Sequence, residues 1–196
     1  MKLNSRLYII TNVIIMLTKE SKNMEITYRK VDRDTLADFI LIAGWANDES
    51  IKHLTTPDFT GGGVPAVTAE ELFEHAHTQT GSYHYMILAD GAAVGEFSIQ
   101  IDPPQIFKKV ANTGWIGITI GRPEFRGRGI GRTAIGFIED ECRKLKLSRI
   151  ELGVFEFNHN AVRLYRNAGY VAIGVIEKFT CWQGSWYKDI RMEKYL

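Results

Sequence analysis

The stretch RPEFRGRGIGRTAIGFIEDECRKL, residues 122–145, joins a glycine-rich segment to an amphipathic helix. Its apolar residues recur at steps of three and four, as on one face of a helix: Ile130, Ala134, Phe137, Ile138, Cys142 and Leu145. A glycine-rich turn lets backbone N–H groups approach an anion, and the dipole of the following helix adds partial positive charge there. The stretch therefore predicts an anion site at the start of a helix that packs on the core.

Three other functional motifs do not fit the glycine-arginine segment. It lacks the Lys-Ser/Thr pair of a nucleotide-hydrolase phosphate loop. The strand expected before it belongs mainly to an antiparallel meander, which does not fit a dinucleotide-binding fingerprint. An RNA-binding arginine-glycine tail would be repetitive and disordered, whereas this segment is single and carries an apolar stripe. A mobile surface loop stays open as the plainest alternative.

The flanking segments predict a mixed α/β domain. A strand over 112–120 precedes the helix and another over 149–155 follows it, which indicates a parallel pair joined by a right-handed crossover. Further strands are expected over 25–31, 82–90, 92–102, 170–180 and 185–196. Further helices are expected after Asp32 or Asp34, and over 45–54, 68–78 and 161–168. The pairs Asp90-Gly91 and Gln183-Gly184 predict tight hairpin turns, and Thr68 with Glu71 predicts a capping box.

Length, charge and cysteine content limit the class of protein. With 196 residues the chain is long enough for one domain with a sizeable core. A net charge of +1 provides no overall field for nucleic acid or an anionic membrane, so neither is expected as a partner. The two cysteines, Cys142 and Cys181, lie far apart in apolar surroundings, which favours reduced thiols and a cytoplasmic location.

The first 23 residues differ from the rest of the chain. Their apolar run LYIITNVIIML, residues 7–17, is too short to span a bilayer, and no small-x-small cleavage site follows it. We therefore expect an N-terminal extension over residues 1–23 and a single domain over residues 24–196.

Two segments together carry a family resemblance. The residues Arg126-Gly-Arg-Gly-Ile-Gly131 resemble the Arg/Gln-x-x-Gly-x-Gly/Ala pyrophosphate signature of the GNAT superfamily of acyl-CoA-dependent N-acetyltransferases. About 28 residues downstream, LGVFEFNHNAVRLYRNAGY is similar to that family's Asn-x-x-Ala-x-x-Leu-Tyr-x-x-x-Gly-Phe/Tyr segment. The matching residues of this segment are Asn158, Ala161, Leu164, Tyr165, Gly169 and Tyr170.

The resemblance implies a fold and a co-substrate. The fold is a twisted mixed sheet of six to seven strands flanked by helices, with a V-shaped splay between the fourth and fifth strands. The co-substrate is acetyl-CoA, with no metal. The implied binding residues are Ile118 and Ile120 through their backbone, Arg126, Gly127, Arg128, Gly129, Ile130 and Gly131 around the pyrophosphate, and Asn158 beside the pantetheine arm. Arg128 and Arg132 either reach the phosphates or face water, and Asn158 also suits a helix N-cap.

The implied reaction transfers acetyl to a primary amine by direct attack in a ternary complex. The resemblance assigns Tyr165 as general acid, since a phenol with a pKa near ~10 can protonate a departing thiolate with a pKa near ~8.5. By spacing alone Tyr165 would be a core residue. Glu96, on the polar face of the third strand, is the candidate base; the alternative is an ordinary solvated carboxylate. The fourth strand has no acid of its own, unlike that of some family members.

The acceptor is the least determined part. A protein N-terminus, a polyamine or another small-molecule amine all fit, in a monomer or a homodimer. The candidate anchors for a cationic acceptor are Asp48, Glu49, Asp58 and Glu177; the alternative is that they are ordinary surface acids. The candidate walls of the acceptor site are Trp45, Trp182 and Trp186; the alternative is that they fill the core. A non-catalytic module that holds acyl-CoA as a sensor or scaffold is the alternative function.

Overall fold

The computed structural model describes residues 24–196, so the expected 1–23 extension lies outside the described residues. The elements are β1 (Ile26–Lys30), α2 (Ala37–Ala46), α3 (Lys52–Thr55), α4 (Ala69–Thr78), β2 (Ser82–Ala89), β3 (Ala92–Ile101), β4 (Thr113–Thr119), the 3-10 turn η1 (Pro123–Phe125), α5 (Ile130–Lys144), β5 (Arg149–Phe155), α6 (His159–Asn167), β6 (Val171–Trp182) and β7 (Ser185–Tyr195). Within this part of the chain no helix is long and apolar enough to cross a membrane.

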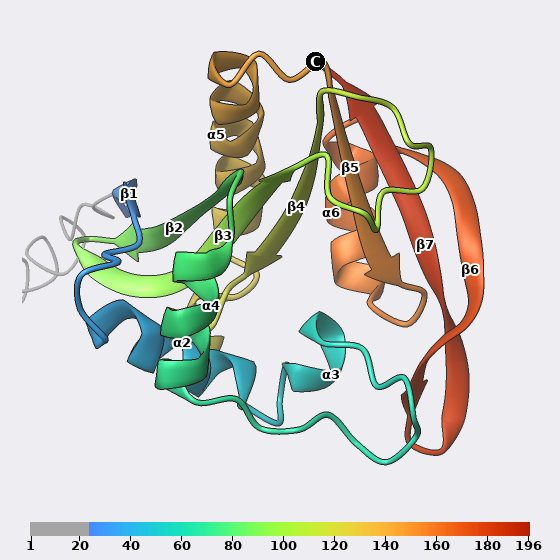
Figure 1. Cartoon of the computed structure of the whole chain (residues 1–196), viewed down its shortest axis with the longest axis horizontal. Helices are drawn as coiled ribbons and strands as arrows, with labels where there is room; N and C mark the ends of the chain where they lie inside the picture. Colours follow the sequence, from blue (N-terminus) through green and yellow to red (C-terminus); the bar gives the residue numbers. More distant parts are fainter. Residues whose placement is uncertain (1–23) are drawn as a thin grey trace, which may run out of the picture.

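The strands form one mixed sheet of seven, in the order β1-β2-β3-β4-β5-β7-β6. Among residues 24–196 only β4 and β5 are parallel neighbours, and α5 makes the crossover between them (Figure 1). The sequence prediction of a mixed sheet with this parallel pair is confirmed.

Two of the predicted turns set the antiparallel register. Asp90 and Gly91 have φ values of 47° and 80°, and Gln183 and Gly184 have 49° and 75°. Positive φ at both central residues is the type I′ geometry that matches the twist of paired strands. The predicted hairpins β2–β3 and β6–β7 are therefore confirmed.

The two faces of the sheet are covered by different helices. Helix α5 buries Ile135 and Ile138 in the main core, against Phe97 and Ile99 of β3. On the opposite face, Phe39 and Ile42 of α2 close over Met86 of β2, and residues of α4 complete this second cluster (Figure 1). On this second face, α2 and α4 do not separate strands β4 and β5 from α3 and the segments around it.

The helix expected over 45–54 is broken. Helix α2 ends at Ala46, and only Lys52–Thr55 forms the next helix. The Asp48 side chain accepts a hydrogen bond from Ser50 N at 2.8 Å, a local turn that competes with helix formation. The capping box of α4 is confirmed, because Glu71 N donates to Thr68 Oγ1 at 3.1 Å and Thr68 N to Glu71 Oε2 at 2.8 Å.

Candidate active site between β4 and β5

Strands β4 and β5 separate after three paired residues. Thr113 pairs with Arg149, and the register ends where Trp115 pairs with Glu151. Beyond that point the two strands diverge, as Figure 1 shows. Alternate backbone groups on the inner edge of β4 then have no strand partner, because β3 occupies only its outer edge. The opening therefore offers hydrogen-bonding groups along the segment that contains Ile118 and Ile120.

The glycine-rich loop places free donors beside this opening. Gly127 and Gly129 have φ values of 73° and 84°, a region that costs other residues steric strain. Within residues 24–196, none of the N–H groups of residues 127–131 donates to another group. These consecutive donors, at the positive end of the α5 dipole, suit the oxygens of a diphosphate.

The third glycine of the loop lets two helices approach. A Cβ at Gly131 would lie 3.1 Å from Leu164 Cδ2, closer than ordinary packing. Gly131 begins the first turn of α5, and Leu164 belongs to α6. This contact brings the two sequence motifs together in space.

Arg126 is engaged with the protein itself. Its guanidinium donates to the carbonyl oxygens of Ile120 at 2.9 Å and Gly121 at 2.6 Å, and to Ser50 Oγ at 3.2 Å. It also lies 3.5 Å from Asp48 Oδ2. Arg126 thereby ties the glycine-rich loop to the end of β4 and to the segment before α3.

The other arginines of the loop are more exposed. The guanidinium of Arg122 lies 5.1 Å and that of Arg128 lies 5.5 Å from the ring centroid of Phe125. Arg128 and Arg132 are both exposed. They form a basic rim around the free N–H groups.

Tyr165 lies in α6 and is 6% exposed, packed in the main core with Leu152 and Val162. Its hydroxyl makes no hydrogen bond within residues 24–196, yet it is not sealed off as the Tyr28 hydroxyl is. Burial raises the pKa of Tyr165 above its ordinary value. The phenol therefore stays protonated at neutral pH, as a proton donor requires.

Asn158 caps α6, since its Oδ1 accepts a hydrogen bond from Ala161 N at 3.2 Å. One of the two roles expected for this residue is thus confirmed. The thiol of Cys142 is buried, and burial raises its pKa to about 12. Such a thiol is a poor nucleophile.

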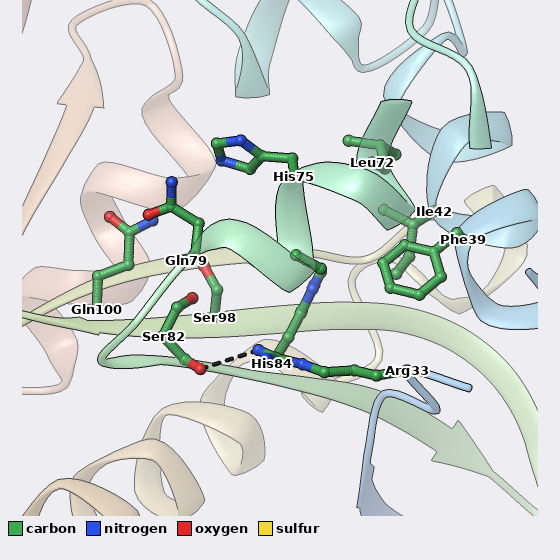
Figure 2. Close-up of a pocket in the computed structure, with 11 residues that line it drawn as sticks. Arg33, Phe39, Ile42, Leu72, His75, Gln79, Ser82, His84, Ser98 and Gln100 are labelled. Carbon is green, nitrogen blue, oxygen red and sulfur yellow. Dashed lines mark hydrogen bonds between the residues drawn. The ribbon is translucent and has the colours of Figure 1, made fainter. Parts of the chain in front are cut away.

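Glu96 faces the same side of the sheet as α2 and α4. It pairs with Thr119, in the diverging half of β4, and its Oε2 lies 2.7 Å from His84 Nε2. His84 lines a cavity of about 150 Å³ between α4 and the sheet. Figure 2 shows this cavity, with His75 and Gln79 on one side and Ser98 and Gln100 on the other. Glu96 is thus connected to this cavity through His84.

A buried charge network was missed from the sequence. Arg149 is fully buried and donates to Glu193 Oε2 at 2.6 Å, to Thr113 Oγ1 at 3.0 Å and to Glu151. It is the first residue of β5 and pairs with Thr113, the first of the three pairs between β4 and β5. The network therefore clamps the closed end of the splay. The sequence signal for this network was that charged residues alternate along β5 and β7, two strands that lie inside the sheet and not at its edge.

An acid-base pair continues this network toward the opening. Arg191 Nε lies 2.7 Å from Asp189 Oδ2, and the Arg191 guanidinium lies 4.8 Å from the Trp115 ring centroid on β4. A Cβ at Gly153 would come within 2.6 Å of the Asp189 carboxylate. Burial raises the pKa of Asp189 to about 6, and Arg191 opposes the shift. Both residues lie on β7, opposite Gly153 and Phe155 of β5, beyond the last residue of β5 that pairs with β4.

Most of the acids proposed to anchor a cationic acceptor already have hydrogen-bond or ion-pair partners within the protein. Asp58 accepts hydrogen bonds from the N–H groups of Thr60, Gly61 and Gly63, at 2.9, 2.8 and 2.8 Å. Glu177 Oε1 lies 3.2 Å from Lys188 Nζ. Asp48 accepts a hydrogen bond from Ser50 N and lies 3.5 Å from the Arg126 guanidinium, as described above. Glu49 remains, with a side chain that is 90% exposed.

The three tryptophans proposed as walls of the acceptor site also differ in their surroundings. The Trp45 ring lies flat against Gly121, where a Cβ would come within 2.2 Å of it. Trp186 is 44% exposed. Trp182 lines a second cavity, of about 380 Å³, between the α3 region and the tip of the β6–β7 hairpin. Of the three, Trp182 borders this cavity, whose volume is sufficient for a small acceptor.

Among residues 24–196 no group of three or more His, Cys, Asp and Glu is arranged to hold a metal ion.

A model of the acetyltransferase (GNAT) family matches residues 49–170. An uncharacterized N-acetyltransferase in the pepI 3′ region of Lactobacillus delbrueckii subsp. lactis is 32% identical over 89 residues, which are 45% of this chain and 51% of that protein. The match therefore spans about half the length of this curated relative.

Solved structures share the fold over nearly the whole described chain. A ribosomal-protein-alanine N-acetyltransferase from Brucella melitensis superposes with a TM-score of 0.71 at 22% identity, covering 87% of this chain and 99% of that one. A spermidine N-acetyltransferase from Vibrio cholerae, in complex with CoA and spermine, gives 0.71 at 22% identity, covering 87% and 95%. Both likenesses concern the fold.

Proposed function

The chain belongs to the acetyltransferase (GNAT) family, and from that premise we propose that it transfers an acetyl group from acetyl-CoA to a primary amine. The observation that carries the proposal is the run of free N–H groups at residues 127–131, beside the splay of β4 and β5. A diphosphate at the loop and an acyl arm in the splay would satisfy both sets of unpartnered backbone groups.

The residues that would hold acetyl-CoA fall in two groups. The N–H groups of Gly127, Arg128, Gly129, Ile130 and Gly131 take the diphosphate oxygens, with Arg126 keeping the loop in place. Asn158 caps α6 through its Oδ1, which leaves its amide N–H₂ group to hydrogen-bond the pantetheine arm. Bound in this way, acetyl-CoA supplies an activated acetyl group as a thioester.

The inner edge of β4 positions the reacting carbonyl. In an antiparallel strand successive N–H groups point to opposite edges, so those between Ile118 and Ile120 that do not serve β3 point into the splay. A donor aimed at the thioester oxygen stabilises the negative charge that develops there in the transition state. The side chains of Ile118 and Ile120 pack on the main core and hold the strand in position.

Tyr165 and Glu96 carry out the two proton transfers of the reaction. As the amine nitrogen forms its bond to the carbonyl carbon, it loses a proton, which Glu96 accepts directly or through water. As the carbon–sulfur bond breaks, Tyr165 donates its phenolic proton to the departing sulfur. His84 holds the Glu96 carboxylate in one orientation by the 2.7 Å contact.

A protein N-terminus, a polyamine and another small amine all remain acceptors within this proposal. The names of the structural neighbours indicate a ribosomal protein in one case and spermidine in the other. A cytoplasmic protein without a nucleic-acid or membrane partner, acting as a monomer or homodimer, is part of the same proposal.

The test is a panel of primary amines incubated with acetyl-CoA and read by thiol release. The proposal expects release that depends on both protein and amine, together with thermal stabilisation by coenzyme A. Stabilisation without release across the panel would instead support an acyl-CoA sensor or scaffold. No stabilisation by any coenzyme A species would overturn both functions.

A further inference from the structure

The strands on either side of the splayed pair carry carboxylates at the same level of the sheet. Strand β3 flanks β4, and β7 flanks β5 (Figure 1). Four residues beyond the last pair between β4 and β5 come Thr119 on β4 and Phe155 on β5. Glu96 of β3 pairs with Thr119, and Asp189 of β7 pairs with Phe155. The mechanism proposed above uses Glu96 and leaves Asp189 without a role.

Both carboxylates also lie on the same face of the sheet. Paired residues place their side chains on one face, and so do residues two apart along a strand. The register therefore carries a single face from Glu96 across β4 and β5 to Asp189. This is the face that α2 covers, opposite the main core. An amine that approaches the splay from the side of Glu96 would have Asp189 on its other flank.

The Asp189 carboxylate lies over β5 because residue 153 is a glycine. A Cβ at Gly153 would lie 2.6 Å from Oδ2 and 2.9 Å from Oδ1 of Asp189. Gly153 is two residues beyond the last residue of β5 that pairs with β4. The carboxylate therefore extends from β7 across β5 toward the opening between β4 and β5.

Asp189 has an ion-pair neighbour but no hydrogen-bond donor within residues 24–196. Arg191 Nε lies 2.7 Å from Oδ2, yet this N–H has no hydrogen-bond acceptor and so is not directed at that oxygen. Asp189 is 2% exposed, and its oxygens are not sealed from solvent as the Tyr28 hydroxyl is. Burying a carboxylate without donors is costly, so this position favours a donor from outside the chain.

The surroundings of Asp189 leave its carboxylate charged at neutral pH. Its strand partners, Phe155 on β5 and Ile176 on β6, are uncharged, and Gly153 lies beside the carboxylate. Among residues 24–196 the charged group that acts on Asp189 is Arg191 of its own strand. Burial raises the pKa of Asp189 to about 6, and Arg191 opposes the rise, so the carboxylate is mainly ionised at neutral pH. An ionised carboxylate without hydrogen bonds suits an ammonium group.

We propose that Asp189 binds the ammonium group of the acceptor and holds its nitrogen at the opening between β4 and β5. The proposal rests on the proposed acetyltransferase function and narrows the acceptor to amines that arrive protonated. The ammonium releases one proton to water before the nitrogen attacks, and Glu96 accepts the second as the nitrogen–carbon bond forms. Asp189 binds the nitrogen and takes no proton itself.

The experiment compares a primary alkylamine that the protein acetylates with its β-fluorinated analogue. Fluorine withdraws electrons, so the analogue is largely unprotonated at neutral pH, whereas the alkylamine is an ammonium ion. Asp189→Asn should lower kcat/KM for the alkylamine by about 10-fold to 100-fold, chiefly through a higher acceptor KM, because a charge-assisted hydrogen bond is lost. The loss for the fluorinated analogue should be clearly smaller, because a neutral amine forms no ion pair.

Stability and co-substrate binding are measured in the same variants. Asp189→Asn should not lower the thermal midpoint, because the amide removes a buried charge, and KM for acetyl-CoA should be unchanged. Gly153→Ala, whose Cβ would displace the carboxylate, should also raise KM for the alkylamine. Asp140→Asn removes an exposed carboxylate of α5, on the opposite face of the sheet, and is the charge-matched control with no expected effect.

Two results would overturn the inference while leaving acetyl transfer standing. An unchanged acceptor KM in Asp189→Asn would mean that water alone meets this carboxylate. An equal loss for the alkylamine and its fluorinated analogue would mean that Asp189 shapes the site without binding the ammonium. Absence of transfer by the wild-type protein to every amine, with thermal stabilisation by coenzyme A retained, would count against the proposed function and the inference together.

Discussion

His84 Nε2 and Glu96 Oε2 lie 2.7 Å apart on neighbouring strands β2 and β3. The contact fixes a carboxylate beside Thr119, in the part of β4 that has left β5. It also links that carboxylate to the cavity of Figure 2, which His84 lines. Glu96 thus has a fixed position beside the diverging half of β4.

Glu96→Gln should lower kcat by about 100-fold, because a positioned general base contributes two or more orders of magnitude. The amide keeps the shape, so KM for acetyl-CoA should not change. Steady-state thiol release checks this outcome. Glu74→Gln, at an exposed position of α4, is the control. Equal kcat in the Glu96 and Glu74 variants would remove Glu96 from the mechanism.

Tyr165→Phe should lower kcat by about 100-fold through loss of the proton donor. The free energy of unfolding should change little, since the ring packing is kept and the hydroxyl has no hydrogen-bond partner in residues 24–196. Tyr170→Phe is the matched control, because its ring lies 5.8 Å from that of Tyr165 and its hydroxyl is buried. A normal turnover rate in Tyr165→Phe would mean that this tyrosine is only a core residue.

Gly129→Ala should destabilise the protein by about 1–2 kcal/mol, because its φ of 84° strains any side chain with a Cβ. It should also raise KM for acetyl-CoA by disturbing the free N–H groups. Gly136→Ala, in the exposed part of α5 with nothing within 4 Å, should instead stabilise by up to ~1 kcal/mol and leave KM unchanged. Urea unfolding and kinetics measure both effects, and equal KM in the two variants would contradict a diphosphate site at this loop.

Asp189 should give the stability a distinctive pH dependence. Its pKa is raised from 3.8 to about 6 by burial, so its contribution is present below pH 3.8 and is lost as the pH rises through 6. A shift of about two pKa units corresponds to ~3 kcal/mol. Relative to wild type, Asp189→Asn should therefore gain up to ~3 kcal/mol between pH 4 and pH 7.

Urea unfolding of both proteins at several pH values measures this difference, and the other carboxylates cancel in the comparison. A difference that falls as the pH rises would show that attraction to Arg191 outweighs burial.

Local sequence patterns predicted most of the fold. Asp90 and Gly91 set one hairpin, and the apolar stripe from Ile130 to Leu145 set the main helix. These features depend on residues close together in the chain. The break at Asp48 was missed because a single side-chain hydrogen bond to Ser50 overcame helix propensity.

The candidate site was predicted less completely, because its partners come from distant segments. Ser50, which accepts a hydrogen bond from the Arg126 guanidinium, is 76 residues away, and nothing near Arg126 in the sequence indicates this contact. Likewise the cavity that Lys52 and Trp182 both line is formed by segments more than a hundred residues apart in the chain. The order β5-β7-β6, which makes charged strands central, is itself a long-range property.

The close approach of Gly131 to Leu164 makes these two positions interdependent. Leu164 precedes Tyr165 on α6, so any side chain added at 131 would press on the turn that carries the tyrosine. A larger residue at 131 would be tolerated only if 164 became smaller, and the two substitutions should rescue each other. An engineer who wishes to alter the loop must therefore redesign α6 in the same step.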